Sequence, residues 1–132
     1  MIYMYCFTTK ELKELKAFLR ESNIHDGLFD QASFNQVDKT FTAHIENHIW
    51  NASFSMIFSG IRKFVATSDF AWGTDETICD LIEIHDEESC PAEIDYNDKN
   101  SNLCFVWEML SGNRMYIVCK ELKVSQGDGS EF

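Results

Sequence analysis

The chain has 132 residues and a formal net charge of −11. This length suits a single domain and is short for two. Nucleic-acid binding needs lysine and arginine to neutralise phosphates, so the charge argues against nucleic acid as a partner and, in the same way, against an anionic membrane surface. A basic protein partner remains compatible with it.

The cysteines and the apolar segments predict a cytoplasmic protein. No apolar run approaches the roughly 20 residues of a membrane-spanning helix, and the short N-terminal segment has no basic leader. The five cysteines are odd in number and show neither a C-x-x-C motif nor zinc-site spacing, so no cofactor or metal is expected. Cys79, Cys104 and Cys119 lie in apolar patterns and are expected to be buried thiols. Cys90, in a loop, is the candidate for a reactive thiol.

A short apolar strand, residues 1–7, is expected to lead into a helix. Thr8-Thr9-Lys10-Glu11 fits a capping box, in which a hydroxyl and a carboxylate bond to free backbone N–H groups. Apolar residues then recur at helical spacing, and Ser22-Asn23 is the expected end. The stripe consists of Leu12, Leu15, Phe18 and Leu19.

A three-strand meander is expected after the turn His25-Asp26-Gly27. With turns at Asp38-Lys39 and Trp50-Asn51, Phe34 would lie opposite Ala43, and Ala43 opposite Phe58. Both registers place the same side chains on the same face, as the period of two requires.

The second half of the chain predicts further strands. Gly60 suggests a bulge, residues 78–84 a fourth strand, and turns at 98–101 and 111–113 two closing hairpins. The first hairpin would pair Ile94 with Phe105 and the second Trp107 with Ile117. Residues 1–125 are therefore expected to form a single α+β domain, with one N-terminal helix packed on a mostly antiparallel sheet of about six or seven strands. Residues 126–132 are expected to be a disordered tail.

The most distinctive polar pattern is His44-x-Glu46-x-His48, whose side chains share one face of a strand, together with Trp50. About 13 Å separates the two histidine backbones, so both cannot readily ligate one ion. Three interpretations stay open: a solvated sheet face, a partner-binding surface, and a small-molecule or metal-dependent enzyme site. Phe29 is expected on the same face, and exposed aromatics there would suit a partner or a homodimer interface.

An acidic stretch is the other candidate surface. Between Lys63 and Lys99 there is no lysine or arginine, and the interval holds half of the 22 acidic residues, including Asp86, Glu87 and Glu88. Such a patch would orient and speed association with a basic partner. The alternatives are a calcium site, for which the EF-hand loop pattern is missing, and a solvated edge that discourages aggregation.

No catalytic motif occurs: there is no G-x-S-x-G, no Walker loop and no G-x-G-x-x-G after a strand. We therefore expect a non-enzymatic protein-binding module.

The segment 23–29, with its His-Asp turn, and the later Phe58-Ser59-Gly60-Ile61 resemble a pattern in small uncharacterised bacterial α+β proteins, some of proposed toxin-immunity type. The resemblance covers about half the chain. It implies an immunity-type inhibitor of a basic partner, such as a nuclease toxin, and assigns no functional residues.

Overall fold

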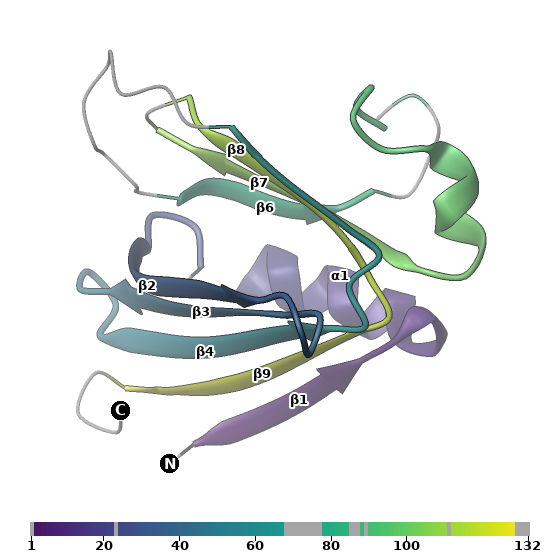
Figure 1. The fold of residues 1–132 in the computed structure, drawn as a ribbon. Helices are drawn as coiled ribbons and strands as arrows, with labels where there is room; N and C mark the ends of the chain where they lie inside the picture. Colours follow the sequence, from purple (N-terminus) through teal and green to yellow (C-terminus); the bar gives the residue numbers. More distant parts are fainter. Residues whose placement is uncertain are drawn as a thin grey trace.

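The structure is a computed structural model that describes residues 2–22, 24–67, 78–84, 88, 90–110 and 112–128, without the side chains of 29, 30, 67, 78–80 and 128. Within these residues the chain forms two antiparallel sheets and one α-helix (Figure 1). The prediction of mostly antiparallel sheet with one helix is confirmed, whereas the prediction of one sheet with six or seven strands is wrong. No helix in this part of the chain is long and apolar enough to cross a membrane.

The first sheet has five strands in the order β1-β9-β4-β3-β2, and the second has four in the order β5-β8-β7-β6. The strands of the first sheet are β1 (Tyr3–Phe7), β9 (Glu121–Asp128), β4 (Ala52–Ser59), β3 (Thr40–Asn47) and β2 (Leu28–Asn35). Those of the second are β5 (Lys63–Thr67), β8 (Arg114–Cys119), β7 (Leu103–Met109) and β6 (Ile78–Glu83).

Two adjacent crossings join the sheets, one at Gly60 between β4 and β5 and one at Lys120 between β8 and β9. The Lys120 N–H donates to the Ser59 carbonyl at 3.1 Å, and the Arg62 N–H donates to the Val118 carbonyl at 2.8 Å. Gly60 has a φ of 65°, a left-handed conformation that favours glycine. The predicted bulge is therefore a corner at which the chain changes sheet.

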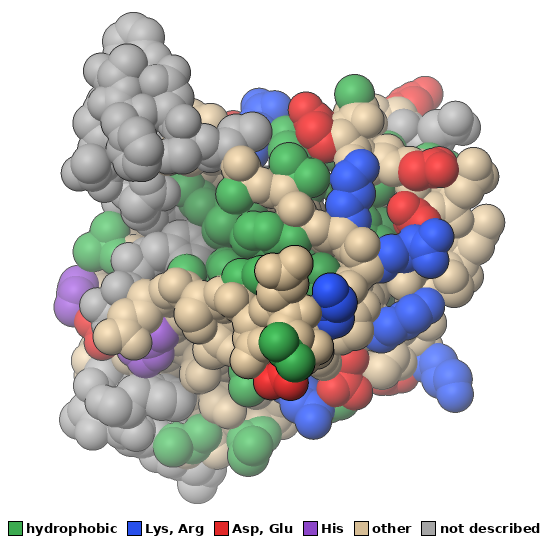
Figure 2. All heavy atoms as spheres, viewed as in Figure 1, with side chains coloured by type: hydrophobic (Ala, Val, Ile, Leu, Met, Phe, Trp, Pro, Cys, Tyr) green, Lys and Arg blue, Asp and Glu red, His purple; other side chains and the backbone are tan. Residues whose placement is uncertain are grey.

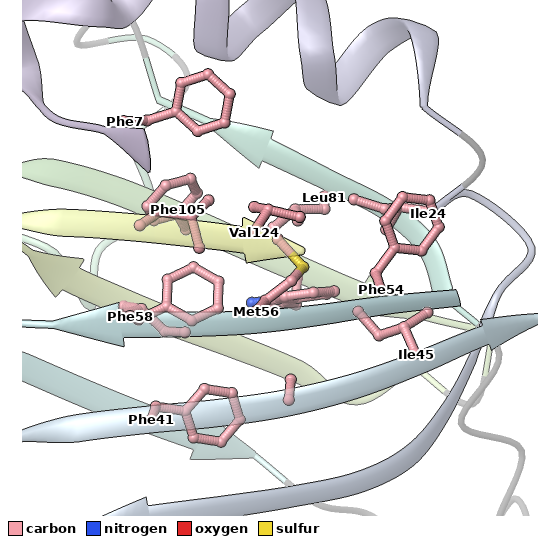
Figure 3. Close-up of a cluster of buried hydrophobic side chains, with 14 of the residues drawn as sticks. Phe7, Ile24, Phe41, Ile45, Phe54, Met56, Phe58, Leu81, Phe105 and Val124 are labelled. Atoms are coloured by element: carbon pink, nitrogen blue, oxygen red, sulfur yellow. The ribbon is translucent and has the colours of Figure 1, made fainter. Parts of the chain in front are cut away.

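The core lies between the two sheets (Figure 3). The Phe58 ring on β4 lies edge-on to Phe105 and Trp107 on β7, with centroid distances of 5.1 and 6.0 Å. All three side chains are fully buried. Aromatic edge-to-face contacts of this kind stabilise a packed interior beyond their area alone.

The helix begins as the sequence predicts. Thr8 and Glu11 form the capping box, followed by the 3-10 turn η1 (Thr9–Glu11) and α1 (Leu12–Glu21). Leu15 is fully buried, and the rest of the apolar stripe packs against the same core. The helix lies at the side of the two-layer structure, against β1 and β6, so it closes the gap between the sheets (Figure 1).

Three of the four predicted hairpin registers are wrong by two residues, a shift that keeps each position on its predicted face. The exception is the start of β2, where a register shift between Phe29 and Gln31 places Phe29 opposite Ile45, so its predicted position on the face of His44 and Glu46 is wrong. The observed pairs include Phe34 with Phe41, Ala43 with Met56, and Trp107 with Met115.

In the first two hairpins, the observed register differs from the predicted one because an asparagine at the end of the first strand bonds to the backbone of the turn. Asn35 Oδ1 accepts from the N–H groups of Val37 and Asp38, both at 3.0 Å. Asn47 accepts from two backbone N–H groups in the next hairpin in the same way. Each turn therefore begins directly after its asparagine, earlier than the predicted turns at Asp38-Lys39 and Trp50-Asn51.

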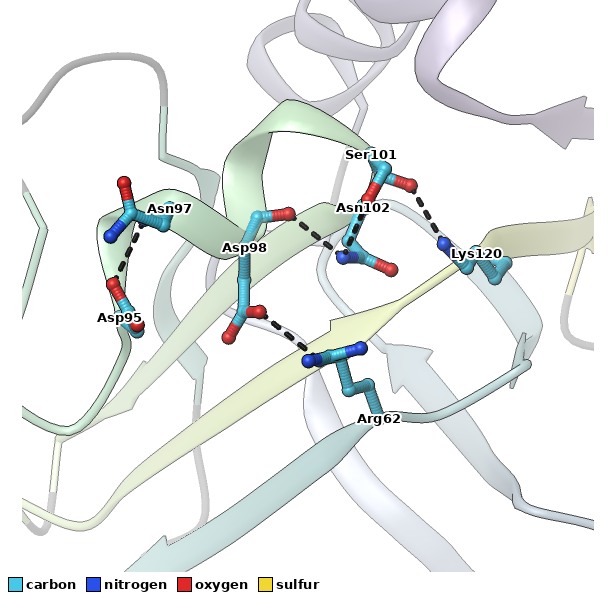
Figure 4. Close-up of polar contacts among 7 residues, drawn as sticks. All are labelled: Arg62, Asp95, Asn97, Asp98, Ser101, Asn102 and Lys120. Atoms are coloured by element: carbon cyan, nitrogen blue, oxygen red, sulfur yellow. Dashed lines mark hydrogen bonds and ion pairs between the residues drawn. The ribbon is translucent and has the colours of Figure 1, made fainter.

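The segment before β7 is the 3-10 helix η3 (Tyr96–Asn100), so the predicted hairpin pairing Ile94 with Phe105 is wrong. This segment is tied to both crossings (Figure 4). Arg62 Nε lies 3.0 Å from Asp98 Oδ1, and Lys120 Nζ donates to the Ser101 carbonyl at 3.0 Å.

The C-terminal strand extends into the predicted tail. β9 reaches Asp128, and Gln126 pairs with Tyr3 on β1 and with Phe54 on β4. Residues 129–132 lie outside the described residues, so disorder there and the domain boundary stay predictions.

Candidate functional site

The side chains of His44 and His48 both contact Glu46, which lies between them. Glu46 Oε1 lies 3.5 Å from His44 Nε2, and Glu46 Oε2 lies 3.6 Å from His48 Nε2. His44 and Glu46 are on the outer face of β3, with 22% and 32% of their side chains exposed, whereas His48 is 72% exposed in the turn that follows. Glu46 therefore presents a half-buried carboxylate between two imidazoles. Figure 2 shows histidine side chains beside an acidic one at the end of the molecule that carries the β3–β4 turn.

The neighbours of this cluster differ from the predicted ones because of the register. His44 lies between Gln31 on β2 and Ser55 on β4, and Glu46 lies beside Ser53. Ser53 is fully buried, and its hydroxyl has no hydrogen-bond partner among the described residues. A small hollow of about 170 Å³ opens here. Its lining residues are Glu46, Asn47, His48, Asn51, Ala52 and Ser53.

Each histidine contacts a different oxygen of Glu46. In the part of the chain that the structure describes, no three histidine, cysteine, aspartate or glutamate side chains are placed to hold one metal ion. The cluster thus has the arrangement of a polar surface with a carboxylate at its centre.

Trp50 lies in the β3–β4 turn, where a turn was predicted, and does not continue the strand face of His44 and Glu46 with which it was also grouped. Its side chain is 64% exposed and that of the adjacent Ile49 is 71% exposed. Asn47, only 1% exposed, holds this turn: its Oδ1 accepts from the N–H of Ile49 at 3.0 Å and of Trp50 at 3.3 Å. Its Nδ2 also donates to the His25 carbonyl at 3.1 Å, so the β3–β4 turn is fixed to the turn between α1 and β2.

Of the predicted partner-binding residues Phe29, Asp86, Glu87 and Glu88, the structure describes only Glu88 and the backbone of Phe29. Phe29 pairs with Ile45 across β2 and β3, but its side chain lies outside the described residues. Asp86 and Glu87 also lie outside them. Glu88 is exposed and follows β6, and the C-terminal end of β6 lies at the end of the molecule opposite the β3–β4 turn (Figure 1). Among the described residues, the segment with Glu88 therefore does not adjoin the cluster around Glu46.

One member of the acidic stretch is buried. The Glu83 side chain is completely inaccessible, Lys99 Nζ lies 2.6 Å from its Oε1, and the Cys104 N–H donates to its Oε2 at 3.4 Å. Burial raises the pKa of Glu83, while Lys99 opposes that rise. This pair connects η3 to β6 and β7, and no periodic pattern in the sequence separates Glu83 from the other acidic residues of the stretch.

The cysteines behave largely as predicted. Cys104 and Cys119 are buried, and burial raises the pKa of these thiols to about 11 and about 12. Cys90 is half-buried, and its Sγ donates to the Ile94 carbonyl at 3.3 Å. The thiol of Cys6 is exposed on β1, and the side chain of Cys79 lies outside the described residues.

Sequence reasoning missed Asn47 and Ile49 as parts of this site. The available signal was a repeat of turn chemistry: Asn35 and Asn47 each end a strand and precede an exposed apolar residue by two positions. Those residues are Val37, which is 90% exposed, and Ile49. Lys39 and Asn51 then have positive φ values of 56° and 49°.

No protein-family model and no curated protein matches this chain.

Proposed function

We propose that this chain is a non-enzymatic protein-binding module that binds a basic partner protein through the β3–β4 turn. The observation that carries the proposal is the fixed display of Ile49 and Trp50. Tryptophan is among the residues that most often dominate binding energy, and large exposed apolar side chains are typical of interaction sites.

The turn is organised before any partner arrives. Asn47 bonds to both backbone N–H groups that carry the exposed side chains, and it is itself anchored to the His25 carbonyl. A loop that is already ordered loses less conformational entropy on binding, so more of the contact energy appears as affinity.

The charge of the chain supports a basic partner. The net charge of −11 attracts a cationic protein over a long range. Glu46 adds a half-buried carboxylate directly before Asn47, the residue that holds the turn. A toxin-immunity inhibitor is the narrower form of this proposal, and it rests on the sequence resemblance.

Capture from a native lysate tests the proposal, with the wild type, Trp50→Ala and Val37→Ala as baits. Val37 is the matched control because it is exposed in a turn built by Asn35 in the same way. We expect one basic protein to bind the wild type and Val37→Ala, to be released by moderate salt, and to bind Trp50→Ala at least about tenfold more weakly. Equal capture by Trp50→Ala, or no capture by the wild type, would contradict the proposal.

A further inference from the structure

The edge strand β1 differs from the other edge strands of the described residues. Exposed sheet edges are usually blocked by charges, bulges or short length, because their free backbone groups can pair with another chain. β2 has an irregular register near Asp30, β6 has one near Asp80, and β5 begins with Lys63. β1 contains no charged residue and pairs with β9 without interruption.

β1 is also apolar and accessible. The exposed fractions of Tyr3, Met4 and Tyr5 are 54%, 80% and 37%, so the strand offers both backbone groups and apolar surface. Its Tyr3–Phe7 span of about 17 Å is enough to pair with five residues of an extended segment.

A groove runs beside this edge, between β1 and α1. Its volume is about 560 Å³. The apolar floor includes Tyr5 and Phe18, whose ring centroids are 4.9 Å apart. The described residues that line the groove are Tyr5, Phe7, Glu14, Ala17, Phe18, Glu21, Ser22 and Gln126.

The rim of the groove is acidic. Glu14 and Glu21 are exposed on the helix, and none of the described residues that line the groove is a lysine or arginine. Arg20 lies 3.5 Å from Glu21, but both side chains are more than 70% exposed, so this ion pair is weak and can exchange for another cation. The Ser22 hydroxyl, buried without a hydrogen-bond partner among the described residues, adds an unused polar group at one end.

We propose that an extended, basic peptide segment of a partner binds here by adding a strand to β1. A strand added at the usual spacing of about 4.8 Å would direct alternate side chains into the groove against Tyr5 and Phe18. Lysine or arginine stems would cover the aromatic rings while their charged ends reach Glu14 and Glu21.

Charge decides between this occupant and a second copy of the chain. Pairing of β1 with β1 of another molecule would bring two acidic rims together, each on a chain with a net charge of −11. A basic segment instead meets opposite charge at Glu14 and Glu21. The site does not include Trp50 or the β3–β4 turn, so this inference stands independently of the function proposed above.

A labelled eight-residue peptide that alternates valine with arginine is the probe, and fluorescence anisotropy is the readout. The groove variant is Glu14→Lys with Glu21→Lys. The matched control is Glu93→Lys with Glu108→Lys, which changes the net charge equally outside the groove. We expect the groove variant to bind about tenfold more weakly and the control to stay within about twofold of the wild type.

A second peptide, with proline in place of valine, separates strand pairing from charge attraction because proline has no N–H to donate. We expect it not to bind, and we expect the arginine–valine peptide to slow amide hydrogen exchange in residues 3–6. Trp50→Ala should bind the peptide as the wild type does. Absence of binding, equal binding of the proline peptide, slowed exchange at another edge, or a dimer through β1 in sedimentation would each overturn the inference.

Discussion

Lys99 Nζ lies 2.6 Å from Oε1 of Glu83, a carboxylate with no accessible surface. The pair fixes the η3 segment to the second sheet. Since a buried charge without its partner is strongly unfavourable, the pair makes this segment sensitive to single substitutions.

Lys99→Met should lower the free energy of unfolding by about 3 kcal/mol, because it leaves Glu83 buried without its cation. Urea denaturation gives the value. Glu83→Leu combined with Lys99→Met should recover most of the loss, since both desolvated charges are then removed. A double variant as unstable as the sum of the single changes would refute the assignment.

The raised pKa of Glu83 also predicts a pH dependence. Between its ordinary value of 4.5 and its higher folded value, the folded protein holds more protons at this residue than the unfolded chain does. Its contribution to the free energy of unfolding is therefore complete below 4.5 and declines as pH rises through the folded pKa. Urea unfolding of the wild type and Glu83→Gln across this range should show that only the wild type carries this decline. A stability difference that does not change with pH would count against it.

Gly60→Ala should destabilise the corner between the sheets. Its φ of 65° disfavours a side chain, and a Cβ there would lie 2.8 Å from both Cβ and Cγ of Lys120. We expect a loss of about 2 kcal/mol, measured by thermal or urea unfolding. Gly112→Ala is the control, because Gly112 also has a positive φ but no heavy atom within 4 Å of the added Cβ. Equal losses would show that the contact with Lys120 is unimportant.

Asn47→Ala should affect both stability and binding. It removes two acceptor contacts in the turn and the bond to His25, so we expect about 2 kcal/mol of destabilisation and weaker partner binding. Asn35→Ala removes the same turn bonds at an exposed site and should cost less than about 1 kcal/mol. Denaturation and the lysate capture assay provide the two readouts, and identical behaviour of the two variants would contradict the anchoring role of Asn47.

Cysteine alkylation provides a check on the core. The thiolate is the reactive form, and burial raises the pKa of Cys104 and Cys119 to about 11 and about 12. Desolvation and the nearby Glu121 also raise the pKa of Cys6, but its thiol is exposed. Iodoacetamide at about pH 8 should therefore modify Cys6 slowly in the native protein and both buried thiols only after denaturation. Peptide mass spectrometry identifies the sites. Rapid native labelling of Cys119 would show that the region between the sheets opens.

The sequence predicted local structure well where the signal was local. The capping box at Thr8, the apolar stripe around Leu15 and the faces of β3 and β4 all follow from nearest-neighbour chemistry. The division into two sheets could not be predicted in this way. The alternation of apolar and polar residues continues across Gly60 and Lys120 and does not indicate that the chain changes sheet there.

The candidate site was predicted only in part for the same reason. The His44–Glu46–His48 alignment follows from the period of two. The position of Trp50 depends on the Asn47 turn, which shifts the register, and the open edge at β1 depends on strand order, which no single strand reveals.

The most direct test of the protein-binding function is photocrosslinking in native lysate from position 50, with benzoylphenylalanine in place of Trp50 and the same residue in place of Val37 as the control. The structure predicts a single dominant crosslinked protein, basic in character, from position 50 and none from position 37. No crosslink from position 50, or the same products from both positions, would contradict the assignment of the β3–β4 turn as a partner-binding surface.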